Sequence, residues 1–231
     1  QNIIYDKSKI LYGFSHAKQA IKEKAKVILV EGYFDVILPY QSGVKNIVAT
    51  SGTALTEQHV RLIKRICSDV TSCFDSDAAG FEATKRAYFL LQSAGLLLKT
   101  VVGLQQKDPA DFIVESKGNF EELINQAPDF IDFFVEKLLT ENDVNTLTGR
   151  RKIINELIAC YYGMSAMERD FFVRKLAVKF NMAEKYLYEE MENSKLAKNH
   201  PARFVDNSVT TTASKIILDE LILALVLEYP Y

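Results

Sequence analysis

The chain has 231 residues, of which 48% are hydrophobic and 25% charged, and its formal net charge at pH 7 is −2. This length can hold one large domain or two modest ones with a real core, and the near balance of charge excludes a histone-like protein that binds through bulk positive charge. The sequence contains neither an apolar run of about 18 residues, as a membrane span requires, nor a secretory signal. We therefore expect a cytoplasmic protein with no membrane partner.

The first half of the sequence alternates strand and helix patterns. Runs of β-branched and aliphatic residues predict strands at 27–30, 46–50, 70–74 and 99–104. Helical patterns lie between these runs, at 33–41, 56–67 and 81–94. Gly95 suits the C-cap of the last of these helices. This alternation predicts βαβ units, and hence an α/β fold with a Rossmann-like parallel sheet and helices on both faces.

The strand patterns stop after about residue 115, and apolar residues then recur at helical spacing. Pro128 suits the first turn of one helix, and capping-box patterns that start at Ser165 and Asn181 open two more. The apolar residues on the inward faces are Phe130, Phe133, Phe134, Leu138, Ile153, Ile154, Leu157, Ile158, Tyr161, Leu187 and Met191. This half is predicted to be an all-helical bundle.

These patterns divide the chain into five parts. They are a lead-in segment at 1–25, the α/β domain at 26–115, the helical bundle at 116–198, a polar linker at 199–215 and the start of a further domain at 216–231. The apolar helix predicted within the last part either docks on the bundle or opens that next domain. Because the first residue is Gln rather than Met, we expect a processed or excised piece of a longer protein.

Acidic residues stand where three of the predicted strands end. Glu31 follows the first strand directly, Asp75 and Asp77 follow the third, and Asp108 and Asp111 follow the fourth. Parallel strands end at one edge of their sheet, where ligands bind, so these carboxylates are expected to converge. Converging carboxylates make a site for a hard cation, and such a cation typically binds phosphate groups.

Each acid also has a plain structural reading. Glu31 can stabilise the dipole of the helix that follows it, and Asp35 can cap that helix. Asp75 and Asp77 are residue types that ordinary turns and N-caps use. The chain between Glu31 and Asp75 is long enough for two βα units, so that their strands can be neighbours or near neighbours in one sheet. This pairing favours the metal site.

Gly52 and Thr53 lie in another turn between a strand and a helix, where Gly52 permits a tight turn whose backbone amides can face a phosphate. The sequence has no Walker A or G-x-G-x-x-G motif, and no Ser-His-Asp or Cys-His set that indicates covalent chemistry. The three cysteines and three histidines show no paired spacing. They fit reduced thiols and argue against a zinc site in this sequence.

Together these motifs resemble a TOPRIM domain, in the version that bacterial DnaG-type DNA primases have. The matching stretches are Glu31-Gly-Tyr-Phe-Asp35, Ser51-Gly-Thr-Ala-Leu55, Phe74-Asp-Ser-Asp-Ala-Ala-Gly80 and Asp108-Pro109. Residues 3–13 resemble the segment that leads into this domain. Topoisomerases and gyrases with the same fold place other residues after the glutamate, so the resemblance favours a primase.

The resemblance implies a DNA-directed RNA polymerase that makes short RNA primers on single-stranded DNA from ribonucleoside triphosphates. Glu31, Asp75 and Asp77 would be the catalytic metal ligands, with Asp108 on the same acidic edge. Asp111 stands one place beyond the second acid of the family pattern. The implied cofactor is Mg²⁺, with Mn²⁺ as a substitute. Zinc belongs only to an N-terminal module that this sequence lacks.

The resemblance also implies residues that bind nucleotide or template, namely Lys7, Tyr33, Asp35, Gly52 and Thr53. It implies a replicative helicase as a partner, through the C-terminal domain. Without the N-terminal parts of the family, the chain is expected to make primers poorly. Two other readings stay open: a topoisomerase- or nuclease-type TOPRIM protein that cleaves DNA, and a non-catalytic fragment that docks on a helicase.

Overall fold

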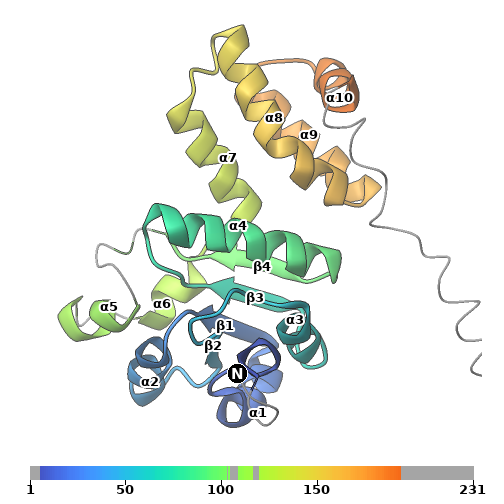
Figure 1. Ribbon diagram of the computed structural model, residues 1–231. Helices are drawn as coiled ribbons and strands as arrows, with labels where there is room; N and C mark the ends of the chain where they lie inside the picture. Colours follow the sequence, from blue (N-terminus) through green and yellow to red (C-terminus); the bar gives the residue numbers. More distant parts are fainter. Residues whose placement is uncertain (1–5, 103, 105–108, 117–119, 194–231) are drawn as a thin grey trace, which may run out of the picture.

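The computed structural model describes residues 6–102, 104, 109–116 and 120–193. One sheet lies between layers of helices, and further helices stand above it in Figure 1. The strands are β1 (Lys26–Val30), β2 (Ile47–Ala49), β3 (Asp69–Ser72) and β4 (Leu97–Thr100). They pair in parallel in the order β2-β1-β3-β4. The predicted fold class, a Rossmann-like parallel sheet followed by helices, is confirmed.

The fourth strand lies earlier in the chain than its sequence pattern indicates. The prediction of 99–104 is wrong, because pairing begins at Leu97, opposite Asp69, and β4 ends at Thr100. The cause is the turn after α4 (Ala78–Ser93). There Gly95, with a φ of +73°, turns the backbone from α4 into the strand within two residues. The Leu97 amide therefore already donates to the Ser68 carbonyl at 3.0 Å.

Alternate residues of the strands face two hydrophobic clusters, so both faces of the sheet are covered. Val27 and Leu29 face a cluster that includes residues of α1 (Phe14–Lys24), α3 (Glu57–Lys64) and α4. Ile28 and Val30 face a cluster that includes residues of α2 (Tyr33–Gln41), α5 (Pro109–Ser116) and α6 (Phe120–Asn125). The prediction of helices on both faces is thus confirmed.

The lead-in segment and the stretch after residue 115 contribute more to this core than the sequence indicated. Residues 7–9 form a short 3₁₀ turn, η1 (Lys7–Lys9), and α1 buries Ala17 and Ile21 completely. Beyond the predicted boundary at 115, α6 packs Phe120 and Ile124 on the sheet side. The division of the chain stays a prediction. Its parts at 199–215 and 216–231 lie outside the described residues.

The second half consists of α7 (Phe130–Glu141), α8 (Leu147–Gly163), α9 (Ala166–Phe180) and α10 (Glu184–Asn193). The capping box at the start of α9 is confirmed, since the Ser165 amide donates to the Glu168 carboxylate at 2.7 Å. The placement of Pro128 in a first turn is wrong, because α7 has Asp129 as its N-cap. The Pro128 carbonyl instead accepts the amide of Thr100, at 3.0 Å, and ties this segment to β4.

The second predicted capping box is also wrong. Asn181 does not open α10 but ends α9, in the left-handed conformation with a φ of 46°. Asparagine tolerates this conformation better than most residues. The left-handed turn allows the Met182 amide to donate a hydrogen bond to the Ala177 carbonyl at 3.0 Å. The sequence pattern is the same for both roles, so the backbone geometry decides between them.

Aromatic packing fixes the helical half against the α/β half. Phe81 and Tyr88 of α4 contact Phe130 of α7, with ring centroids 6.4 and 4.9 Å apart respectively. Lys85 of α4 also pairs with Glu156 of α8 at 2.9 Å. Since both halves share one hydrophobic cluster, core packing holds α7 and α8 beside α4. Within the described residues, none of the helices has the length and apolar character needed to cross a membrane.

Candidate active site

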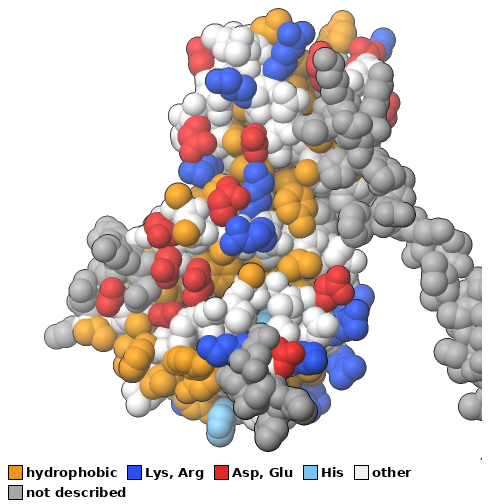
Figure 2. Space-filling model, in the orientation of Figure 1, with side chains coloured by type: hydrophobic (Ala, Val, Ile, Leu, Met, Phe, Trp, Pro, Cys, Tyr) orange, Lys and Arg blue, Asp and Glu red, His pale blue; other side chains and the backbone are white. Residues whose placement is uncertain are grey.

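Glu31, Asp75 and Asp77, three of the predicted acids, lie at the carboxyl edge of the sheet. Glu31 comes directly after β1, and Asp75 follows β3, which is the neighbour of β1 in the sheet. The sequence allowed these two strands to be neighbours or near neighbours, and in the sheet they are neighbours. On the left of Figure 2, acidic side chains gather over the side of the sheet where α2, α4 and α5 begin.

The charges of the neighbouring carboxylates act on the side chain of Glu31. Burial raises the pKa of its half-buried side chain above the usual range, and the negative charges of Asp75, Asp35 and Asp77 raise it further. The backbone amide of Asp75 opposes these effects by stabilising the ionised form. Four carboxylates thus share one electrostatic field. A bound cation would relieve the repulsion that ionised Glu31 meets there.

The turn after β3 holds Asp75 and Asp77 in different ways. Asp77 is exposed and is the N-cap of α4, where its carboxylate accepts the Gly80 amide at 2.8 Å. Gly80 lies against the main chain of Asp75: a Cβ added there would be 2.0 Å from the Asp75 carbonyl oxygen. The absence of a side chain at Gly80 therefore allows the first turn of α4 to close on Asp75. The sequence placed Gly80 in the motif but gave it no role.

Asp35 and Tyr33 occupy the first turn of α2. The buried Asp35 carboxylate accepts the Gly32 amide at 2.9 Å and so caps the helix. This contact fits the structural reading of Asp35, although its charge also acts on Glu31. Tyr33 is 40% exposed and meets Tyr12 edge to face, with ring centroids 4.7 Å apart. The two rings offer a partly exposed aromatic surface beside the acidic edge.

The loop after β2 forms a cavity with Glu31. Gly52, with a φ of +75°, and Thr53 line this cavity of about 330 Å³ together with Glu31, and Arg86 of α4 is also among its lining residues. The Thr53 hydroxyl donates to the Thr50 carbonyl at 2.9 Å and stabilises the turn. The sequence gave no role to Arg86. Only the packing of α4 on the sheet brings this cation to the acidic edge.

Lys7 also reaches this loop, since its ammonium donates to the Ser51 carbonyl at 3.2 Å. Asp111 lies exposed in the first turn of α5, a helix that packs against α2. Asp108 lies outside the described residues, so its position on the acidic edge stays a prediction. The structure thus brings together the predicted residues that follow β1, β2 and β3.

Within residues 6–102, 104, 109–116 and 120–193, no three His, Cys, Asp or Glu side chains are arranged to hold a metal ion. The chemistry of the site nevertheless fits a hard cation, because its donors are carboxylate oxygens that repel one another. Asp77, like Asp35, already uses its carboxylate to cap a helix. Its Oδ1 accepts the Gly80 amide, so Asp77 can keep this cap and still offer its second carboxylate oxygen to an ion.

Comparison with known proteins agrees with this geometry. The family described as Toprim-like matches residues 28–113. The DNA primase of Halalkalibacterium halodurans is 36% identical over 82% of this chain and 33% of its own length. A DNA primase domain from Pseudomonas aeruginosa has 26% identity and a TM-score of 0.70, over 84% of this chain and 62% of that one.

A DnaG primase catalytic domain whose structure is bound to single-stranded DNA has 27% identity and a TM-score of 0.68, over 80% of this chain and 61% of that one. The chain spans about a third of the length of the curated relatives it matches. The fold, the carboxylates at the edge of the sheet and the similar proteins all indicate the same family. The chain belongs to the bacterial DnaG-type DNA primases, and it comprises their TOPRIM domain with the helical part of the RNA polymerase domain.

Proposed function

We propose that this chain forms the catalytic part of a DNA primase, which joins ribonucleotides into a short RNA primer on single-stranded DNA. The observation that carries the proposal is the convergence of Glu31 and Asp75 at the ends of two neighbouring parallel strands. The curated relatives and the solved structure that this chain resembles are DNA primases. A topoisomerase- or nuclease-type activity has no such support among them.

The acidic edge would bind Mg²⁺, or Mn²⁺ in its place, through Glu31, Asp75 and Asp77, with Asp108 near by. A bound ion supplies charge neutralisation for the attacking and leaving oxygens of the phosphoryl group. The protein contributes geometry: Gly80 and the N-cap at Asp77 fix the turn that carries Asp75. No covalent intermediate on the protein is required.

Nucleotide and template would lie over the neighbouring surface. Arg86 brings positive charge to the cavity that Glu31, Gly52 and Thr53 line, and Lys7 brings it to Ser51 in the adjoining loop; this charge suits the phosphates of a nucleotide. Tyr33 with Tyr12 offers ring faces of the kind on which unpaired bases stack. The relative with bound single-stranded DNA supports a template on this fold. A helicase partner and a cytoplasmic place of action follow from the family alone.

Asp75→Asn and Asp77→Asn are expected to weaken Mn²⁺ binding by about 10- to 100-fold while the protein stays folded. Asparagine caps a helix about as well as aspartate, so Asp77→Asn keeps the start of α4. Asp69→Asn is the matched control, because Asp69 lies at the opposite end of the same strand. Titration of Mn²⁺ followed by electron paramagnetic resonance measures the binding. Wild-type affinity in both site variants would refute the metal assignment.

The reaction class needs a separate assay. In a primer-synthesis reaction with the chain joined to its upstream family domains, the same two variants should lose nucleotide incorporation. The wild-type protein should leave supercoiled DNA unrelaxed. Relaxation or nicking that depends on Asp75 would instead identify a cleaving TOPRIM enzyme.

A further inference from the structure

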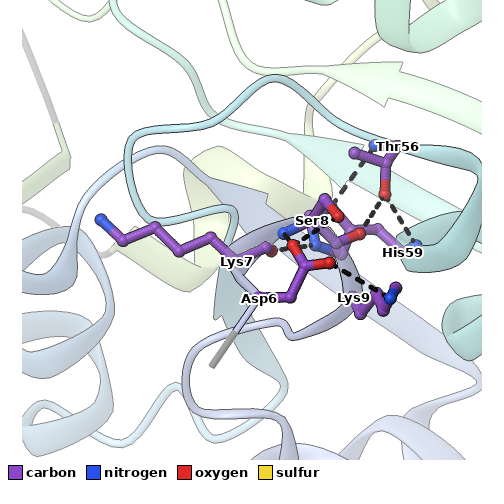
Figure 3. A network of polar contacts seen from close by, with 6 residues as sticks. All are labelled: Asp6, Lys7, Ser8, Lys9, Thr56 and His59. Atoms are coloured by element: carbon purple, nitrogen blue, oxygen red, sulfur yellow. Dashed lines mark hydrogen bonds and ion pairs between the residues drawn. The ribbon is translucent and has the colours of Figure 1, made fainter. Parts of the chain in front are cut away.

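His59 is a buried polar residue with no role in the site described so far. Its side chain has 0% exposure, at the third position of α3, and both ring nitrogens have partners. Nδ1 lies 3.3 Å from the Thr56 amide, which can only donate, and Nε2 lies 2.8 Å from the Lys7 carbonyl, which can only accept. These contacts require the neutral ring with its proton on Nε2. Figure 3 shows this network.

Thr56 completes the attachment of the N-terminal segment to α3. Its hydroxyl donates to the Ser8 carbonyl at 2.6 Å and accepts the His59 amide at 3.2 Å. Asp6 fixes the far side of the same turn, because its carboxylate accepts the Ser8 amide at 3.0 Å and pairs with Lys9 at 3.2 Å. Two side chains from the start of α3 therefore hold the backbone of Lys7 and Ser8.

This attachment leads to the active-site loop. With its backbone held by His59, Lys7 extends its side chain away from the network, as Figure 3 shows, and its ammonium meets the Ser51 carbonyl at 3.2 Å. The Ser51 amide in turn donates to the Glu31 carbonyl at 2.9 Å. Ser51 holds a φ of 59°, which a serine adopts only when its surroundings enforce it. A continuous set of hydrogen bonds thus runs from His59 to the backbone of Glu31.

We propose that His59 is a positioning residue: it fixes the backbone of Lys7 so that the lysine ammonium is held at the loop beside the Glu31 cavity, where it would meet the phosphates of a bound nucleotide. The part that concerns nucleotide rests on the proposed function. The part that concerns the position of Lys7 does not.

The electrostatic surroundings of the ring agree with this role. Burial lowers the pKa of His59, although the backbone carbonyls of Lys7 and Ile10 and the charge of Asp6 act in the opposite direction. The ring is therefore kept in the neutral form that its two hydrogen bonds require. Asp6 is itself paired with Lys9, and the Lys7 ammonium points away from the ring.

Two substitutions of similar length separate the hydrogen bonds of His59 from its bulk. In His59→Gln the amide oxygen can accept the Thr56 amide, as in a capping box, and the amide nitrogen can donate to the Lys7 carbonyl. His59→Met fills a similar volume and can do neither. His16→Met, at an exposed position on α1, is the control for the loss of a histidine.

The first readout is the rate at which an amine-reactive reagent labels Lys7 in the 231-residue chain, measured by mass spectrometry. The second is the affinity for ATP in the presence of Mn²⁺, and the third is the affinity for Mn²⁺ alone. His59→Met should raise Lys7 labelling about fivefold and weaken ATP binding about tenfold, the size of one charge-assisted hydrogen bond. Its Mn²⁺ affinity should stay within about twofold of the wild type. His59→Gln and His16→Met should match the wild type in all three.

The outcomes separate the two proposals. If the wild-type chain binds neither Mn²⁺ nor ATP, the proposed function fails, and Lys7 labelling alone still decides the role of His59. Unchanged labelling in His59→Met overturns the positioning role. The positioning role is also overturned if His59→Gln folds but its Lys7 is labelled as fast as in the unfolded chain. This second test applies even if His59→Met does not fold.

Discussion

Gly80→Ala is expected to weaken metal binding without changing any carboxylate. The added Cβ would lie 2.0 Å from the carbonyl oxygen of Asp75, a distance that real structures do not show. The backbone of Asp75 must therefore move by roughly 1 Å, and displacements of this size cost catalytic sites about 100-fold in rate. We expect Mn²⁺ affinity to fall at least about tenfold and the melting temperature to fall by about 5–15 °C.

Gly149→Ala provides a matched control for this prediction. Gly149 occupies the same position in α8 as Gly80 does in α4: it is the third helical residue, its amide bonds to the N-cap side chain, and an added Cβ would lie 2.0 Å from the carbonyl oxygen of Asp143. The loss of stability should be similar in the two variants. Only Gly80→Ala should also lose Mn²⁺ affinity in the folded protein. Equal Mn²⁺ affinity in both would show that Gly80 serves the helix and not the site.

The parts of the fold that the sequence predicted are those where local pattern and tertiary burial agree. Residues 27–30 and 70–74 are buried, including the polar Thr71 and Ser72, because β1 and β3 are central strands with both faces covered. The acids after these strands could be placed on one edge because parallel strands share their direction. The convergence of Glu31 and Asp75 followed from topology, without any knowledge of side-chain contacts.

The parts that the sequence did not predict depend on contacts between distant segments. His59 looks like an isolated histidine until η1 packs on α3 and offers the Lys7 carbonyl. Arg86 is one of several charged residues on α4 until the helix packs beside the loop after β2. Asn181 shows another limit, because the same short pattern can end one helix or begin the next. In each case the deciding partner is far away in sequence or lies in the backbone geometry.

Glu31→Gln is expected to stabilise the protein while it disables the site. Burial and the charges of Asp75, Asp35 and Asp77 hold the pKa of Glu31 above its usual range, so the ionised side chain is less favourable in the folded chain than in the unfolded one. Glutamine removes that charge and keeps an oxygen that can accept the Asp75 amide. At pH 7 in EDTA we expect the melting temperature to rise by about 1–4 °C. Glu23→Gln, at an exposed position on α1, should change it by less than about 1 °C.

The dependence on pH follows from the direction of the pKa shift. A raised pKa means that the folded chain binds the Glu31 proton more tightly, so the stability this group contributes is full below its unfolded pKa, near 4.5, and is lost as pH rises through the folded pKa. The advantage of Glu31→Gln should therefore be largest at neutral pH and shrink as pH falls toward 4.5. Added Mn²⁺ should reverse the order, since the ion stabilises only a protein that binds it. Two results would contradict the role of Glu31 as a metal ligand that is destabilised by its neighbouring charges. One is a Glu31→Gln variant with a lower melting temperature than the wild type in EDTA at pH 7. The other is a variant whose melting temperature rises as much on addition of Mn²⁺ as that of the wild type.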